Sequence, residues 1–156
     1  LATGVAMAEG LDLYLKWPND ILDAEDRKVS GILSEVETSK GGVVYALLGV
    51  GLNVHQREFP GLPQAGSLAN LGRESDRSEL LARLVPRIES ACALVGPDPA
   101  RVIARWEARS AMKGRRVRVG HQEGEAVGLR EDGALLLATD DGLVPVWAGD
   151  VEGVAT

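Results

Sequence analysis

Apolar and polar positions along the first third of the chain predict strands that follow a short helix. Residues 1–9 are small and apolar, which is typical of the end of a buried helix. Strict alternation or short apolar runs then predict three strands, over residues 11–17, 29–36 and 43–54. Pro18 should end the first strand, because proline has no N–H for a sheet. The third segment is almost continuously apolar, which predicts a central strand buried on both faces.

The middle of the chain predicts a long loop and two amphipathic helices. Residues 58–74 contain glycine and proline without a period, so we expect a loop. Asp76 is a candidate N-cap, with Glu79 in the capping-box position. The helix it begins has one apolar stripe, formed by Leu81, Leu84, Val85, Ile88, Cys92 and Val95. Pro86 should bend or break this helix, at a cost of about 3 kcal/mol. Asp98 and Pro99 predict the start of a second helix.

Short strands replace helices from about Lys113 onward. The candidate strands are Val117–Val119, Ala126–Leu129, Ala134–Leu137 and Leu143–Trp147. Asp132-Gly133 and Asp141-Gly142 are typical tight-turn pairs. Several short strands in about 40 residues indicate a small SH3-like β-barrel. The expected fold class is therefore α+β, with a mixed β-sheet and packed helices over residues 1–110 and the barrel over 111–156.

Composition narrows the classes of function. The 156 residues carry a net charge of −6, which argues against a broad nucleic-acid-binding surface. No apolar run approaches the roughly 20 residues that cross a bilayer. Cys92 is the one cysteine, so an internal disulfide is excluded and a reducing cytoplasm is the expected compartment. The sequence starts without Met in an apolar stretch, so we expect it to be a piece of a longer protein.

Two lysines stand at neighbouring strand ends beside an asparagine and an aspartate. Lys16–Asp20 reads Lys-Trp-Pro-Asn-Asp, and Lys28 opens the next strand shortly before Gly31. Polar side chains at strand ends can converge on a ligand, and a lysine can hold phosphate or carboxylate. Asn and Asp are also ordinary turn residues, so residue types alone favour a plain turn. Trp17 is expected to pack in the core.

Three strings in a fixed order resemble the biotin protein ligase family. They are Lys-Trp-Pro-Asn-Asp-Ile at 16–21, Arg-Lys-Val-Ser-Gly-Ile-Leu-Ser-Glu at 27–35 and Gly-Val-Gly-Leu-Asn-Val at 49–54. The resemblance continues through Arg105-Trp106-Glu107 to Trp147–Asp150 and covers essentially the whole chain. It implies a class II synthetase-like catalytic domain. The implied enzyme uses ATP and Mg²⁺ to convert biotin to biotinyl-5′-adenylate, and transfers biotin to a lysine of a biotin carboxyl carrier protein. Family members are monomers or homodimers formed through the sheet.

The resemblance also implies which residues hold biotin. Lys28 matches the lysine that touches both the biotin carboxylate and the α-phosphate of ATP, and Gly31 and Leu33 match positions along the biotin tail. Two anions have to meet in the first step. At 4 Å and an effective dielectric of 20 they repel by about 4 kcal/mol. A fixed cation between them offsets this repulsion, which makes Lys28 the first candidate for a catalytic residue.

Four matched residues are implied at the nucleotide. Lys16 and Asn19 match residues beside the phosphates, and Asn53 matches the asparagine at the adenine end of the adenylate. Asp20 is the second catalytic candidate, because it could orient the incoming amine or accept its proton. Asn19 and Asp20 together are the candidate ligands for Mg²⁺.

The sequence departs from the family pattern upstream. The Gly/Arg-rich loop that covers biotin and the adenylate has no counterpart in the chain, and neither do the strands that bind the biotin ring. We therefore expect a further segment or a second chain to complete the site. The sequence also contains no helix-turn-helix, so nucleic acid is not an expected partner of this chain. Two alternatives stay open: a lipoate–protein ligase-like enzyme, and a non-catalytic fragment or carrier-binding module.

Overall fold

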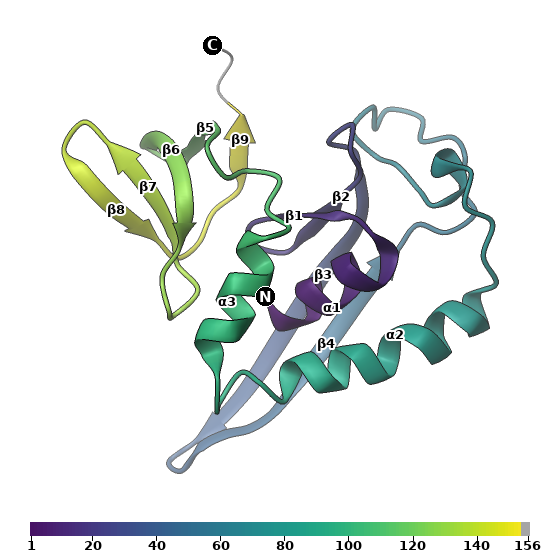
Figure 1. Ribbon diagram of the computed structural model, residues 1–156, viewed down its shortest axis with the longest axis horizontal. Helices are drawn as coiled ribbons and strands as arrows, with labels where there is room; N and C mark the ends of the chain where they lie inside the picture. Colours follow the sequence, from purple (N-terminus) through teal and green to yellow (C-terminus); the bar gives the residue numbers. More distant parts are fainter. Residues whose placement is uncertain (154–156) are drawn as a thin grey trace.

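The computed structural model describes residues 1–153, in which two β-sheets lie beside three α-helices (Figure 1). The first part contains α1 (Ala2–Leu11), β1 (Tyr14–Lys16), β2 (Asp20–Leu22), β3 (Lys28–Ser39), β4 (Gly42–Leu52), the 3₁₀ turn η1 (Ala69–Leu71), α2 (Arg77–Cys92) and α3 (Pro99–Glu107). The second part contains β5 (Arg116–Val119), β6 (Gln122–Leu129), β7 (Leu135–Thr139), β8 (Gly142–Val146) and β9 (Val151–Gly153). We call this second part the β module.

Both sheets are antiparallel, with strand orders β1-β2-β3-β4 and β8-β7-β6-β5-β9. The expected mixed sheet is therefore not found in residues 1–153. Short turns join the strands of the first sheet, and a short turn permits only antiparallel pairing. Parallel contacts outside the strands are limited to two isolated bridges, Leu15 with Ser110 and Lys28 with Ala65. Whether the β module closes as an SH3-like barrel stays a prediction, and residues 154–156 of the predicted barrel lie outside the described part.

The first strand is shorter than its alternating pattern predicts. Helix α1 continues to Leu11 and ends at Asp12, which adopts a left-handed conformation with φ 50° and donates its N–H to Ala8 O. The alternation itself is real, because Leu13 and Leu15 are buried while Tyr14 between them is exposed. Trp17 is buried as expected. The sequence pattern missed β2, a three-residue strand whose pairing depends on β1 and β3 rather than on its own residues.

The β3–β4 hairpin forms as predicted, but the predicted burial of its second strand is wrong. The turn lies at Lys40 and Gly41, and the strands pair from Ser30 with Leu52 to Ser39 with Gly42. Strand β4 is exposed over nearly its whole length, because it is the edge of the sheet and no described element covers its outer side. Figure 1 shows the tip of the hairpin projecting beyond the helices.

Helix α2 begins at its predicted cap and runs through its proline. The Asp76 carboxylate accepts hydrogen bonds from the amides of Ser78 and Glu79, and these bonds lower the pKa of Asp76. Pro86 does not break the helix, which buries Leu84 and Ala91 on either side of it. The stripe is buried only in part: Leu81, Val85 and Val95 are exposed.

The core is centred on α1, which lies between the first sheet and the other two helices. Val5, Ala6, Met7 and Ala8 are almost completely buried, and α1 contacts α2, α3, β1 and β2. This apolar helix supports the end of the sheet where β1, β2 and β3 meet (Figure 1). In residues 1–153, no helix combines the length and apolar character needed to cross a membrane.

Candidate active site

One row of residues runs across all four strands of the first sheet. Lys16 of β1 pairs with Asp20 of β2, Asp20 pairs with Gly31 of β3, and Gly31 pairs with Gly51 of β4. Directly opposite residues in antiparallel strands point to the same face. The side chains of Lys16 and Asp20 therefore rise beside a floor made of two glycines.

Lys28 reaches over this row. Its Nζ lies 2.6 Å from Asp20 Oδ1, in an ion pair between a half-exposed lysine and a largely buried carboxylate. Asp20 Oδ1 has no aligned hydrogen bond from the described residues, so the lysine charge is its main partner. A Cβ on Gly31 would lie 3.1 Å from Lys28 Cε. The glycine thus leaves the space through which the lysine crosses the strand.

The backbone around Lys28 is held on both sides. In the turn before it, Asp23 is buried and accepts hydrogen bonds from the backbone N–H and the guanidinium of Arg27. Lys28 N donates to Gln64 O at 2.7 Å, and Gly66 N donates to Lys28 O at 2.9 Å. These bonds fix where the lysine leaves the strand, and its ammonium group pairs with Asp20 in the cavity.

A cavity of about 770 Å³ opens above the row of residues. The sheet contributes Lys16, Asp20, Lys28, Gly31, Gly51 and Asn53, and the loop after β4 contributes Gln56, Phe59, Leu62 and Gln64. The two lysines of the first two strings therefore face one space. The lining also includes the carboxylates of Asp20 and Asp26. The two ammonium groups beside a flat glycine floor can bind negatively charged groups of a ligand.

Asn53, directly after β4, is another fixed residue in the lining of this cavity. Its backbone N–H donates to Val29 O at 2.9 Å, and its Nδ2 donates to Gly66 O at 2.9 Å. Its side-chain nitrogen is therefore used within the protein.

Two of the residues expected at the site lie outside the lining of the cavity. Asn19 donates from Nδ2 to Ile32 O at 2.8 Å, and Ile32 N donates to Asn19 O at 2.9 Å. Its amide is therefore used to attach the β1–β2 turn to β3. Leu33 follows Gly31 along β3 with an exposed side chain, beyond the cavity.

Sequence reasoning missed the loop residues that line the cavity. Gln56, Phe59 and Gln64 lie in or beside a segment that was read only as a loop. The available signal was Phe59, the one phenylalanine of the chain, placed in a loop rather than in a predicted element.

The described residues do not form a metal site by themselves. They contain no group of three or more His, Cys, Asp or Glu side chains placed to hold a metal ion. Mg²⁺ is usually bound by one or two carboxylates together with substrate phosphates. Asp20 fits the part of a single carboxylate ligand, and the Asn19 amide nitrogen is occupied by Ile32 O.

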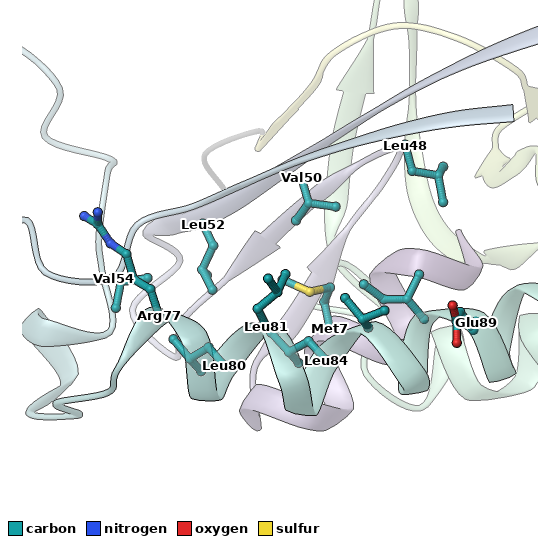
Figure 2. A pocket seen from close by; sticks show the side chains of 12 residues that line it. Met7, Leu48, Val50, Leu52, Val54, Arg77, Leu80, Leu81, Leu84 and Glu89 are labelled. Carbon is teal, nitrogen blue, oxygen red and sulfur yellow. The ribbon is translucent and has the colours of Figure 1, made fainter.

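A second hollow lies on the opposite face of β4 and is apolar. Leu48, Val50 and Leu52 face Leu81 and Leu84 of α2, as Figure 2 shows. The volume of the hollow is about 450 Å³. The hollow is further lined by Met7, Val54, Val85 and Ile88, with Arg77 and Glu89 on α2. We call it the β4–α2 groove. Its lining matches an incompletely covered core rather than a reactive site.

The comparisons with known proteins agree with the geometry. A family model described as "Biotin protein ligase C terminal domain" matches residues 114–152. Over 97% of its length the chain is 38% identical to the biotin--[acetyl-CoA-carboxylase] ligase of Mycobacterium tuberculosis and covers 60% of that protein. Over 96% of its length it is 31% identical to the ligase of the same name from Paracoccus denitrificans, of which it covers 67%.

Other curated relatives are about twice as long as the chain. It is 30% identical to the bifunctional ligase/repressor BirA of Bacillus subtilis over 96% of its own length, but covers only 49% of that protein. Among solved structures, the biotin protein ligase from Aquifex aeolicus in complex with biotin and ATP is 29% identical, with a TM-score of 0.81. That match covers 97% of this chain and 68% of the Aquifex chain.

Proposed function

The chain belongs to the biotin protein ligase family, and we propose that it forms the lysine-bearing part of an active site that activates biotin with ATP. The observation that carries this proposal is the shared cavity: Lys16 and Lys28 face one space above Gly31 and Gly51. The Aquifex relative with a similar fold is described in complex with biotin and ATP. A pocket that brings two anions together needs this kind of paired cationic lining.

In the first step, a carboxylate oxygen of biotin attacks the α-phosphorus of ATP, and the bond to pyrophosphate breaks. Lys28 lies between the two anions and reduces their repulsion, while Lys16 holds the phosphates beside it. The flat floor at Gly31 lets the acid approach the strand, and Asn53 contacts the base. Asp20 would supply one carboxylate oxygen to a Mg²⁺ ion held together with the phosphates of ATP, and this ion would offset the negative charge of the phosphates.

In the second step, a lysine amine of a biotin carboxyl carrier protein attacks the acyl carbon of the adenylate. The bond to AMP breaks, and the amine loses a proton. Asp20 is a carboxylate of the cavity that can orient this amine and take its proton. Its Oδ1 lies 2.6 Å from the Lys28 ammonium nitrogen, next to the point where the two anions meet. Asn19 acts through Ile32 as a positioning residue, and Leu33 extends the biotin side of the pocket beyond its present lining.

The remainder of the catalytic part would complete the site. The chain spans about half the length of curated relatives such as the Bacillus protein, and β4 and the β4–α2 groove are uncovered. We place the division between this part and the SH3-like β module near residue 110. The cytoplasm is the proposed compartment, and a homodimer through the sheet is the alternative cover for β4.

The test is exchange of labelled pyrophosphate into ATP by the complete gene product that contains this chain. We expect exchange that depends on biotin, because reversal of the first step regenerates ATP only when the adenylate forms. The same assay with lipoate in place of biotin is the comparison. Exchange with lipoate instead of biotin would support the lipoate–protein ligase-like alternative, and exchange with neither acid would support the non-catalytic fragment.

A further inference from the structure

The β module touches the site through the tryptophan that follows Lys16. The Trp17 side chain is buried, and its Nε1 donates a hydrogen bond to Gly133 O at 3.0 Å, across 116 positions of the sequence. Gly133 belongs to the β6–β7 turn of the β module. The indole is therefore the direct link between the β module and the turn that carries Lys16, Asn19 and Asp20.

The turn that accepts this bond is itself well fixed. Gly133 adopts φ +87°, and its N–H donates to Arg130 O, while Arg130 N donates to Ala134 O. Asp132 forms an ion pair with Arg130 and accepts a hydrogen bond from the indole of Trp147 at 3.0 Å. These bonds fix the position of the Gly133 carbonyl that accepts the hydrogen bond from Trp17.

The segment that leads into the β module also holds β1. Leu15 N donates to Arg109 O at 2.8 Å, and Ala111 N donates to Leu15 O at 2.8 Å. The free edge of β1 is therefore paired with residues just before the β module. A weaker tie joins Arg115 to Asp26 in the turn before Lys28, at 2.6 Å in an exposed ion pair.

We propose that the β module is a positioning element of the active site, which sets Lys16 relative to Lys28 through the Trp17–Gly133 hydrogen bond. This inference rests on the proposed function. Lys16 ends β1 and is followed at once by Trp17, so a shift of the indole moves the ammonium group that holds the phosphates. Trp17 is a positioning residue, since it lies outside the lining of the cavity.

The test compares two pairs of variants in biotin-dependent pyrophosphate exchange by the complete gene product. Trp17→Phe removes the N–H donor. Trp106→Phe is its control, because Trp106 is equally buried but its indole donates no hydrogen bond within residues 1–153. Gly133→Ala strains the accepting turn, and Gly142→Ala is its control, with φ +114° in a turn that does not meet Trp17. Trp17→Phe and Gly133→Ala should each lower kcat/KM for ATP about tenfold or more, since small misplacements of positioning groups have large effects.

Separate KM values for ATP and for biotin distinguish a positioning role of Trp17 from a role in packing alone. We expect a higher KM for ATP and a lower kcat in Trp17→Phe and Gly133→Ala, with KM for biotin unchanged, because Lys16 serves the phosphates. The controls should lose thermal stability without this change. Variants that lose stability but keep the wild-type KM for ATP would overturn the positioning role. Absence of exchange in the wild type would instead overturn the proposed function.

Discussion

At the scale of single residues, the site depends on three side-chain choices that only work together. Lys28 can meet Asp20 because Gly31 has no side chain between them. Asp20 in turn keeps the ammonium group above the glycine floor rather than in solvent. The same ion pair holds Lys28 in the cavity before any ligand arrives, so less of its side-chain freedom has to be lost on binding.

Lys28→Ala should separate chemistry from folding. The variant should slow adenylate formation by at least about a hundredfold, because it removes the cation between carboxylate and phosphate. Its melting temperature should change little, since half of the Lys28 side chain is exposed. Pyrophosphate exchange and thermal unfolding measure the two effects.

Lys113→Ala is the matched control for this substitution. Lys113 is as exposed as Lys28 and pairs with Glu107 at 3.5 Å, away from the cavity. Its exchange rate should equal that of the wild type. If Lys28→Ala also exchanged at the wild-type rate, Lys28 would have no part in the reaction.

At the scale of elements, α3 connects three parts of the molecule through three consecutive residues. Arg105 forms two hydrogen bonds with Glu9 of α1, at 2.9 and 2.6 Å. Trp106 is buried in the core, and Glu107 accepts a hydrogen bond from the Leu129 amide of β6 at 2.9 Å. The string Arg-Trp-Glu therefore has a structural explanation, as the connection between the helices and the β module.

The Glu9–Arg105 pair predicts an acid-dependent contribution to stability. Its hydrogen bonds to Arg105 lower the pKa of Glu9 from the usual value of 4.5. A lowered folded-state pKa stabilises the protein above about pH 4.5, and this contribution is lost as the pH falls through the folded-state value. Glu9→Gln should therefore lower the free energy of unfolding at pH 7 by less than about 1 kcal/mol, because the pair is partly exposed.

Denaturant unfolding at pH 7 and at pH 3 measures this contribution. The difference between the wild type and Glu9→Gln should shrink as the pH falls, because the Glu9 carboxylate is progressively protonated. Glu131→Gln is the control, an exposed turn carboxylate without an ion pair in the described part of the chain. A difference that stays the same at both pH values would show that charge on Glu9 does not matter.

Local signals predicted those elements whose ends are defined by nearby residues. Asp76 caps α2 through amides two and three residues away, and the Lys40-Gly41 turn brings together strands that adjoin it. Elements that depend on distant partners were missed or misjudged. Strand β2 pairs on both sides with other strands, and the burial of β4 depends on what lies next to it.

The same distinction between local signals and distant partners applies to the candidate site. Lys16, Asp20, Lys28 and Asn53 lie in strings that resemble the family, and the structure brings these four to one cavity. The use of the Asn19 amide by Ile32 could not be read from the sequence, because it depends on how the β1–β2 turn meets β3. The contact of Trp17 with Gly133 is equally non-local, since local patterns carry no information about a partner 116 positions away.

At the scale of the whole molecule, the first sheet has an exposed edge strand that is strongly apolar. Val43, Val44, Leu47, Leu48 and Val50 of β4 are exposed, and the β4–α2 groove lies beside them. An exposed apolar edge strand tends to pair with another chain. The composition of β4 suits burial on both faces, and residues 1–153 do not provide this burial.

Completion of the sheet predicts a change in amide exchange along β4. The amides of β4 that point away from β3 should exchange quickly in a fragment of residues 1–156, because no described residue accepts their hydrogen bonds. In the complete gene product they should become protected, since the remaining catalytic part would supply a paired strand and fill the groove. Hydrogen–deuterium exchange by mass spectrometry measures both samples.

Strand β7 is the internal reference, because it is already paired on both sides with β6 and β8. Its protection should be the same in both samples. Protection of β4 in the fragment that rises with protein concentration would identify a second copy of the chain as the cover, in a homodimer through the sheet. Rapid exchange of β4 in both samples at every concentration would mean that the edge stays open and that neither cover forms.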